Sequence, residues 1–390
     1  MKIKYLFWIL FLLNLLNYID RQVLYAVFPL LQQDLKLNDL QLGTLASAFM
    51  LVYMCYAPIT GYLADRTHRP RLIALSACLW SLATLACATA KNYLALLIPR
   101  ALVGVGEGGF TTIAQPFLAE HYPKQKHAFI LAMFGLALPL GSALGYVIGA
   151  VVGVHWGWKI AFMVAGVPGL FLALLALTCL KDKTREIQTH TPVRLKDYIP
   201  LFKNLPFLQV CLAQAMSTFV MGGLAAWMPV YLYRYLHLDV AKAGSYFGIL
   251  VIVGGALGTY LGGKLAPWWL KRDPHAYGKL IATAFMTALP VCWIVLYTHQ
   301  TIGAWVCLTM ALILLFVPTG AIAAALVATT KPQVRSMAFA VNIFIIHLLG
   351  DAISPTLIGW VSDYRNLKTA VFLASLMLIP GAFFAWRSKA

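Results

Sequence analysis

The chain has 390 residues, of which 61% are hydrophobic and only 11% are charged, against about 25% charged residues in an ordinary soluble protein. A soluble fold cannot bury so much apolar surface, so this composition excludes a soluble globular protein, a disordered chain and a disulfide-stapled secreted domain. The formal net charge of +17 is compatible with nucleic-acid binding, but the basic residues lie in short loops between apolar segments. That placement is typical of membrane topology, and no nucleic-acid partner is expected.

Twelve apolar segments are long enough to cross a bilayer, which takes about 20 helical residues. They lack sustained alternation of polar and apolar residues, which favours helices over strands. The predicted helices cover residues 5–31, 41–63, 71–90, 93–119, 127–152, 158–180, 206–233, 242–268, 279–298, 302–328, 336–361 and 367–387. Pro318-Thr319-Gly320 predicts a break in the tenth of them.

The longest loop divides these helices six and six. We therefore predict an N-terminal six-helix bundle at residues 1–180, a linker at 181–205 and a C-terminal six-helix bundle at 206–390. Within the linker, the apolar residues from Tyr198 to Phe202 indicate a short segment at the membrane interface.

Loop charges predict the orientation. With the N-terminus inside, 21 of the 30 Lys and Arg residues fall on the cytoplasmic side, 7 fall outside and 2 lie within the helices. Both termini are therefore expected in the cytoplasm. The seven cysteines lie in apolar segments without a CxxC pair, so we interpret them as free thiols and expect neither a metal nor a cofactor.

Weak internal repeats accompany the six-plus-six division. Similar small-residue and aromatic strings occur at residues 61–66, 145–149, 259–264 and 359–365, in the second, fifth, eighth and eleventh helices. Because two of these strings end inside and two end outside, the pattern indicates inverted three-helix repeats within two parallel halves. Gly135, Pro139, Gly141, Gly145 and Gly149 form a stripe on the fifth helix, and small residues at four-residue spacing predict its close packing. An exchanger motif is the other interpretation of that stripe.

Residues 61–71 read Gly-Tyr-Leu-Ala-Asp-Arg-Thr-His-Arg-Pro-Arg, which resembles the loop 2–3 signature of the major facilitator superfamily. Arg100 with Gly104 and Gly106 resembles that superfamily's fourth-helix motif. The resemblance implies an all-α polytopic membrane protein that moves a solute by rocking of two halves. We interpret four residues of the signature as a conformational latch between the halves, with a solvated turn as the alternative: Gly61, Asp65, Arg66 and Arg69.

Three further strings resemble the Spinster family within that superfamily. They are Asn17-Tyr18-Ile19-Asp20-Arg21, the segment from Arg100 to Glu107, and His347-Leu-Leu-Gly-Asp351. Members of the family resemble proton-linked transporters of lysophospholipids and sphingosine phosphate. The resemblance implies an anionic lipid-like substrate, protons as coupling ions and, given the short tails, a bacterial inner-membrane protein that acts as a monomer among membrane lipids.

Charges inside the apolar helices are functional candidates because each one costs roughly 2.5–3.5 kcal/mol at mid-membrane. We assign proton coupling to four titratable residues: Asp20, Glu107, His347 and Asp351. His347 and Asp351 are four residues apart, so they can touch on one helix face. The alternative for the others is a static Asp20–Arg100 or Arg21–Glu107 bridge that holds two helices together.

Polar residues on the first and fourth helices predict the substrate site, because Arg can grip a phosphate with two donors. We assign substrate binding to Asn17, Tyr18, Arg21, Arg100, Thr111, Gln115 and Trp227. The seventh and tenth helices have uncharged cores and would face the tail of an amphiphile. A small organic anion or drug is the alternative substrate, and a polytopic lipid enzyme or a channel is the alternative class of protein. We expect no catalytic residues, because no G-x-S-x-G string or metal-ligand cluster occurs.

Overall fold

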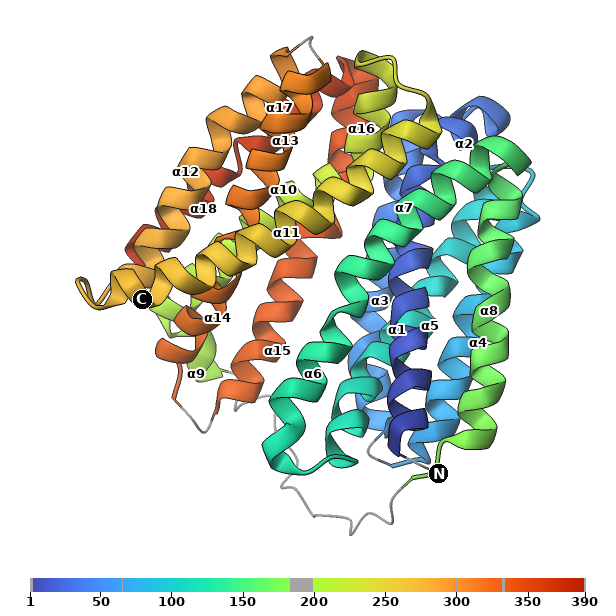
Figure 1. Ribbon diagram of the computed structural model, residues 1–390, viewed down its shortest axis with the longest axis horizontal. Helices are drawn as coiled ribbons and strands as arrows, with labels where there is room; N and C mark the ends of the chain where they lie inside the picture. The colour runs from blue at the N-terminus through green and yellow to red at the C-terminus, as the bar shows by residue number, and fades with distance from the viewer. Residues whose placement is uncertain (1–2, 65, 183–198, 299–300, 332–333, 389–390) are drawn as a thin grey trace. The chain divides into compact units, whose positions relative to one another are not determined.

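The computed structural model describes residues 3–64, 66–182, 199–298, 301–331 and 334–388 (Figure 1). Within these ranges the chain forms helices joined by turns and short loops. Eleven described helical spans are long and apolar enough to cross a membrane. The first helix, α1 (Ile3–Ala26), adds a twelfth of 24 residues; four polar or charged residues, from Asn14 to Arg21, lower its hydropathy.

The chain divides into two compact units, Met1–Ile187 with Ala225–Gly248 and Gln188–Leu224 with Ile249–Ala390. The first unit contains the helices of the first 180 residues (Figure 1): α1, α2 (Phe28–Leu35), α3 (Asp39–Ala64), α4 (Arg69–Ala88), α5 (Tyr93–Glu120), η1 (Lys124–Lys126), α6 (His127–Gly135), α7 (Ala137–Trp156) and α8 (Trp158–Cys179).

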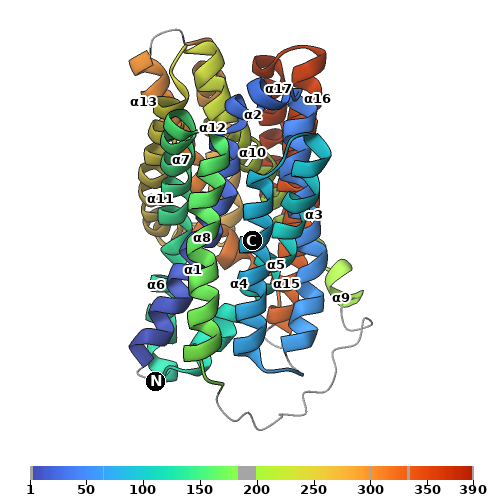
Figure 2. The same ribbon diagram turned by 90° about the vertical axis from the view of Figure 1, so that its right-hand side faces the viewer.

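Two long helices contribute to both units, namely α10 (Leu205–Tyr235) and α11 (Val240–Leu270). The other helices of the second unit follow in Figures 1 and 2: α9 (Ile199–Phe202), α12 (Ala276–Tyr297), α13 (Thr301–Phe316), α14 (Pro318–Ala328), α15 (Arg335–Ile346), η4 (His347–Asp351), α16 (Ser354–Tyr364), α17 (Leu367–Ser375) and α18 (Leu378–Arg387). The short α9 coincides with the segment expected within the linker.

Helix α7 lies against α1 through a stripe of glycines (Figure 1). A Cβ atom added to Gly141 would lie 2.6 Å from the Leu15 carbonyl oxygen, and one added to Gly145 would lie 2.5 Å from that of Ile19. Side chains at these positions would push the two helices apart. The predicted close packing of the fifth span is therefore confirmed.

Helix α5 approaches both α3 and α4 through glycines as well. A Cβ on Gly104 would lie 2.9 Å from the Tyr53 backbone nitrogen, and one on Gly106 would lie 2.6 Å from the Ser76 carbonyl oxygen. This close approach brings the charged residues of α5 within reach of polar and aromatic side chains on its neighbours.

Three predicted spans of the second unit are interrupted. The tenth breaks after α13, and α14 resumes with Pro318 in its first turn, as the Pro-Thr-Gly string predicts. The eleventh passes from α15 into the π-helical turn η4, where Gly350 has non-helical torsions (φ −105°, ψ −108°). The twelfth breaks between the end of α17 at Ser375 and the start of α18 at Leu378. The sequence patterns did not predict the breaks in the eleventh and twelfth spans.

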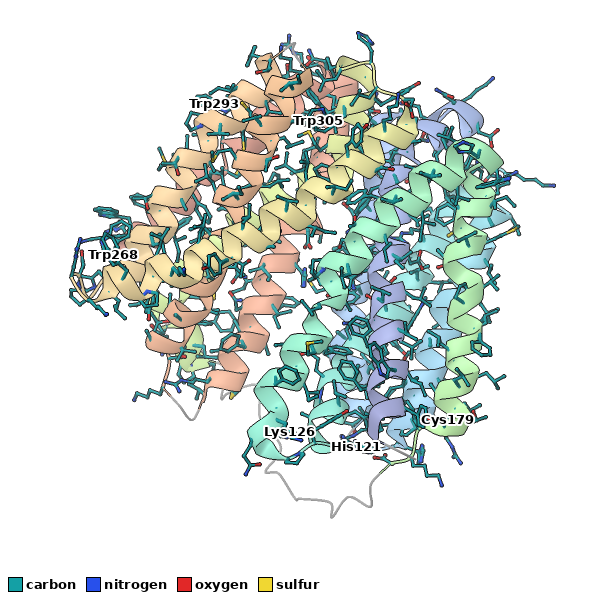
Figure 3. All side chains as sticks on the ribbon, viewed as in Figure 1. His121, Lys126, Cys179, Trp268, Trp293 and Trp305 are labelled. Atoms are coloured by element: carbon teal, nitrogen blue, oxygen red, sulfur yellow. The ribbon has the colours of Figure 1, made fainter. Side chains whose placement is uncertain are left out.

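Tryptophans lie near the C-terminal ends of α11 and α12 (Figure 3). Trp293 is close to the end of α12, while Trp268 lies in the last turn of α11 and is half exposed. The Arg272 guanidinium stacks on the Trp268 ring, with Cζ 4.2 Å from the centroid. Aromatic rings at these two levels are typical of membrane–water interfaces.

Candidate functional site

Four ionisable side chains of α1 and α5 form two ion pairs inside the first unit. We call Asp20, Arg21, Arg100 and Glu107 the charged cluster. Arg21 Nε lies 2.7 Å from Glu107 Oε2, and Arg100 Nη1 lies 3.4 Å from Asp20 Oδ1. The Arg100 and Glu107 side chains are fully buried, and Asp20 is 1% exposed. Both pairings considered from the sequence therefore occur in the same structure.

The Asp20 carboxylate has a second donor on α4. The Thr84 hydroxyl, which is fully buried, donates a hydrogen bond to Asp20 Oδ2. The sequence did not single out Thr84, because the hydroxyl of a threonine inside an apolar helix usually donates its hydrogen bond to the backbone carbonyl oxygen one turn earlier. Asp20 is thus held by helices on two sides.

Aromatic rings surround both guanidinium groups. The Phe49 ring of α3 lies 5.1 Å from Arg21 Cζ and 4.5 Å from Arg100 Cζ, measured to its centroid. Tyr53 and Tyr18 lie 4.7 Å and 5.2 Å from Arg21 Cζ. Desolvated cation–π contacts of this kind contribute about 2 kcal/mol each. The sequence indicated Tyr18, but it gave no reason to choose Phe49 or Tyr53 among the many aromatic residues.

Several buried polar atoms of the cluster lack a hydrogen-bond partner among the described residues. They are Arg21 Nη2, Arg100 Nε and Nη2, and Glu107 Oε1. A buried polar group left without a partner costs about 1–3 kcal/mol, and more when it is charged. The three nitrogen donors come from two permanent cations, so their chemistry fits an anionic acceptor or water.

The other predicted binding residues divide into two sets. Asn17 lies one turn before Arg21, is fully buried, and has no partner for its side-chain amide in the described part of the chain. Thr111 donates to the Glu107 carbonyl oxygen at 3.0 Å and contacts the Tyr53 hydroxyl at 2.7 Å. Both therefore lie close to the charged cluster.

Gln115 and Trp227 lie elsewhere. Gln115 is exposed, and eight helical residues separate it from Glu107 by about 12 Å along the axis. Trp227 is fully buried, with its ring centroid 5.6 Å from that of Phe28. The wall position expected for Trp227 is therefore not seen here, because its ring has no exposed surface.

The predicted latch lies at the end of α3 and the start of α4. Arg69 Nη1 lies 2.7 Å from Glu120 Oε2, and the Arg69 backbone nitrogen donates to Asp182 Oδ2 at 3.3 Å. Arg66 folds back on Tyr62, where its Nη1 donates to the carbonyl oxygen. These contacts join the start of α4 to the end of α5, next to His121, and to the residues that follow α8, which ends at Cys179. Figure 3 labels His121 and Cys179 at the same end of the first unit.

The other two predicted latch residues are Gly61 and Asp65. A Cβ on Gly61 would make ordinary contact with the Thr112 methyl group at 3.4 Å. Asp65 lies outside the described residues.

The predicted pair on the eleventh span forms. His347 Nδ1 lies 2.9 Å from Asp351 Oδ1, and both side chains are 20% exposed. The contact bridges the π-helical turn η4, a geometry that is frequent at functional sites. A Cβ on Gly222 of α10 would lie 2.6 Å from the Asp351 Cβ atom, so α10 packs tightly on this turn.

An ion pair that the sequence did not predict joins α10 to the first residues of α3. Arg234 Nη1 and Nη2 lie 2.7 Å and 2.5 Å from the two Asp39 carboxylate oxygens, and Nη2 also donates to Gln32 Oε1 at 2.7 Å. We call these three residues the Arg234 clamp. It lies at the opposite end of α3 from the latch residues, and its bidentate geometry is the strong form of an Arg–carboxylate contact.

Comparisons with known proteins agree with this arrangement. Residues 10–355 match the Major Facilitator Superfamily profile. The sphingosine-1-phosphate transporter SPNS2 of Danio rerio is 32% identical over 94% of this chain and 79% of its own length. Protein spinster homolog 1 of Homo sapiens is 30% identical over 90% of this chain and 71% of its own length.

A crystal structure has the same fold. A bacterial homologue of the human lysosomal transporter Spinster, in an inward-facing and unoccupied conformation, superposes with a TM-score of 0.88 at 22% identity, covering 99% of this chain and 97% of that one. The predicted twelve-helix fold with inverted three-helix repeats is thereby confirmed. The chain is an integral membrane transporter that belongs to the Spinster family of the major facilitator superfamily.

Proposed function

We propose that the protein is a proton-coupled transporter that moves an anionic amphiphile, such as a lysophospholipid, by alternating access. The observation that carries this proposal is the pair of buried arginines, Arg21 and Arg100, whose three donors have no partner among the described residues. Two permanent cations with donors to spare match the geometry of a phosphate or carboxylate group.

The two ion pairs supply a route for coupling. Glu107 faces Arg21 directly, while Asp20 faces Arg100 and the Thr84 hydroxyl. Protonation of either carboxylate removes its attraction for the partner arginine, which then turns its donors toward the substrate anion. Because linkage is reciprocal, anion binding favours protonation by the same factor.

Relatives support the choice of an amphiphile. The Danio rerio relative is named a sphingosine-1-phosphate transporter, and that lipid joins one phosphate headgroup to one long chain. In this scheme His347 and Asp351 relay protons on the second half, while Gly61, Asp65, Arg66 and Arg69 form the latch. The moving bodies are residues 1–180 and 206–390, joined by the 181–205 linker.

The cellular setting is part of the same proposal. The excess of basic residues in alternate loops favours an orientation with both termini in the cytoplasm, and the membrane in this proposal is the bacterial inner membrane. The protein works there as a monomer among membrane lipids and needs no cofactor or metal.

One observation favours a small organic anion as the second candidate. Trp227, the ring expected to support an acyl chain, is fully buried against Phe28. The donors of the charged cluster would serve a small carboxylate or phosphate equally well.

Transport into proteoliposomes tests the proposal. Purified protein is reconstituted in phosphatidylcholine vesicles, and movement of a lysophosphatidate is followed with and without an inward proton gradient, with a protonophore as control. We expect gradient-dependent transport that Arg100→Gln abolishes. Gradient-independent movement would exclude proton coupling, and transport of benzoate but not of the lysolipid would favour the small-anion alternative.

A further inference from the structure

The second unit contains a hollow that shares no residue with the charged cluster. It has a volume of about 530 Å³ and lies between the start of α12, the length of α14 and the first turns of α15. This volume falls within the range of about 300–1,000 Å³ that is typical of small-molecule sites. The hollow can therefore hold a ligand.

One cation lines the hollow. Arg335, at the first position of α15, is half buried, and its Nε atom is buried without a hydrogen-bond partner among the described residues. No carboxylate lines the hollow within that part of the chain. A guanidinium group stays charged at every physiological pH, so this wall favours an anionic ligand. The Tyr277 side chain of α12 lies on the same lining and offers a hydroxyl.

The remaining lining is apolar except for Thr330, whose hydroxyl donates to the Leu326 carbonyl oxygen. Ala323, Ala324 and Val327 of α14 form one wall, and Phe339 of α15 lies one turn beyond Arg335 on the same helix face. The cation thus lies beside a smooth surface of small side chains and one aromatic ring. A ligand that matches both parts carries a negative head and a hydrocarbon chain.

The volume of the hollow matches a ligand with a single chain. A methylene group fills about as much space as a water molecule in the liquid, about 30 Å³, so the hollow holds about 17 such groups. That number matches a phosphate or carboxylate head with one chain of moderate length.

We propose that this hollow is a second binding site for an anionic single-chain amphiphile, whose head group lies on Arg335 and whose chain lies along α14 and Phe339. The site does not depend on the proposed transport function, because it is built from different residues. It holds such a ligand whether the charged cluster carries a lysolipid or a small anion.

Photo-crosslinking tests the site. The full-length protein in phosphatidylcholine nanodiscs is irradiated with a lysophosphatidate that bears a diazirine at the end of its chain, and the labelled peptides are identified by mass spectrometry. We expect labelling within residues 323–339. Arg335→Gln should lower it about tenfold or more, and Ala324→Phe should lower it by filling the hollow. Lys331→Gln is the matched control, since it removes an exposed cation that does not line the hollow.

Competition experiments test which ligand binds the hollow, and the Arg100→Gln variant tests whether binding there is independent of the charged cluster. Unlabelled lysophosphatidate should compete, whereas inorganic phosphate and two-chain phosphatidylglycerol should not, and labelling should persist in Arg100→Gln. Labelling that is unchanged in both Arg335→Gln and Ala324→Phe, or that is lost in Arg100→Gln, would overturn the proposal. Equal competition by phosphatidylglycerol would contradict the proposal of a single-chain ligand.

Discussion

Replacing Glu107 with glutamine should uncouple substrate binding from pH. Removing one partner of a buried ion pair costs about 3–5 kcal/mol, and the amide that remains can still accept one hydrogen bond from Arg21, worth about 1 kcal/mol. The substitution therefore releases Arg21 by about 2–4 kcal/mol. Because each 1.4 kcal/mol is a factor of ten, the gain in anion affinity has a ceiling of about 30- to 800-fold.

The assay is equilibrium binding of a lysophosphatidate across neutral pH. In the unchanged protein, affinity should rise as the pH falls, because protonation weakens the Arg21–Glu107 pair. Glu107→Gln should bind tightly at alkaline pH with a flattened profile, and it should lose gradient-driven transport while remaining folded. Asp239→Asn is the matched control, since Asp239 is an exposed acid paired only with the exposed Lys242 in the described region.

Asp20 is a second acid that can make binding depend on pH when Glu107 alone is replaced, because it belongs to the other ion pair. Any pH dependence that remains in Glu107→Gln is assigned to Asp20 and should disappear when Asp20→Asn is added. A normal pH profile in both single variants would refute the coupling mechanism.

Three further predictions follow from the described contacts. Arg100→Lys keeps the charge but loses the planar fork, so affinity for a phosphate head should fall about tenfold or more; normal binding by Arg100→Ala would place the headgroup site elsewhere. Asp39→Asn breaks the bidentate contact with Arg234. A cysteine introduced by Tyr233→Cys should therefore react faster with an impermeant maleimide when Asp39→Asn is also present. An unchanged rate would show that the Arg234 clamp does not restrict access of the reagent to residue 233. Affinity should rise with chain length in a lysolipid series, by up to about 0.8 kcal/mol for each buried CH₂, whereas a flat series would favour the small organic anion.

Most of the fold could be predicted from hydropathy and loop charges. Every predicted span corresponds to one, two or three consecutive helices, with ends that differ by at most about four residues. The π-helical turn η4 was not predicted, because the residues around Gly350 have the sequence pattern of an ordinary α-helix. One extra residue in a turn leaves the spacing of His347 and Asp351 compatible with contact, so the pattern predicted the contact without the distortion.

The candidate site was predicted less completely, for two physical reasons. Charges are rare inside the membrane, so Asp20, Arg21, Arg100 and Glu107 stand out in the sequence. Phe49 does not, because an apolar helix contains many similar rings and only the packing of α3 on α5 selects one.

Helical periodicity explains a further miss. It groups Gln115 with Glu107, but eight residues turn Gln115 by about 80° around the helix axis and move it about 12 Å along it, where the side chain is exposed. The Arg234–Asp39 contact joins residues 195 positions apart, and both look like ordinary loop charges.

Burial separates the charged cluster from the Arg234 clamp in their response to ionic strength. The cluster is closed to solvent, with only Arg21 showing as much as 12% of its side chain, whereas the Arg234 side chain is 25% exposed. Mobile ions screen exposed charges beyond about 8 Å at physiological salt and reach buried pairs far less. The Arg234 and Asp39 charges lie only 2.5–2.7 Å apart, so salt will weaken the clamp modestly through its exposed Arg234 side chain and will leave the cluster almost unchanged.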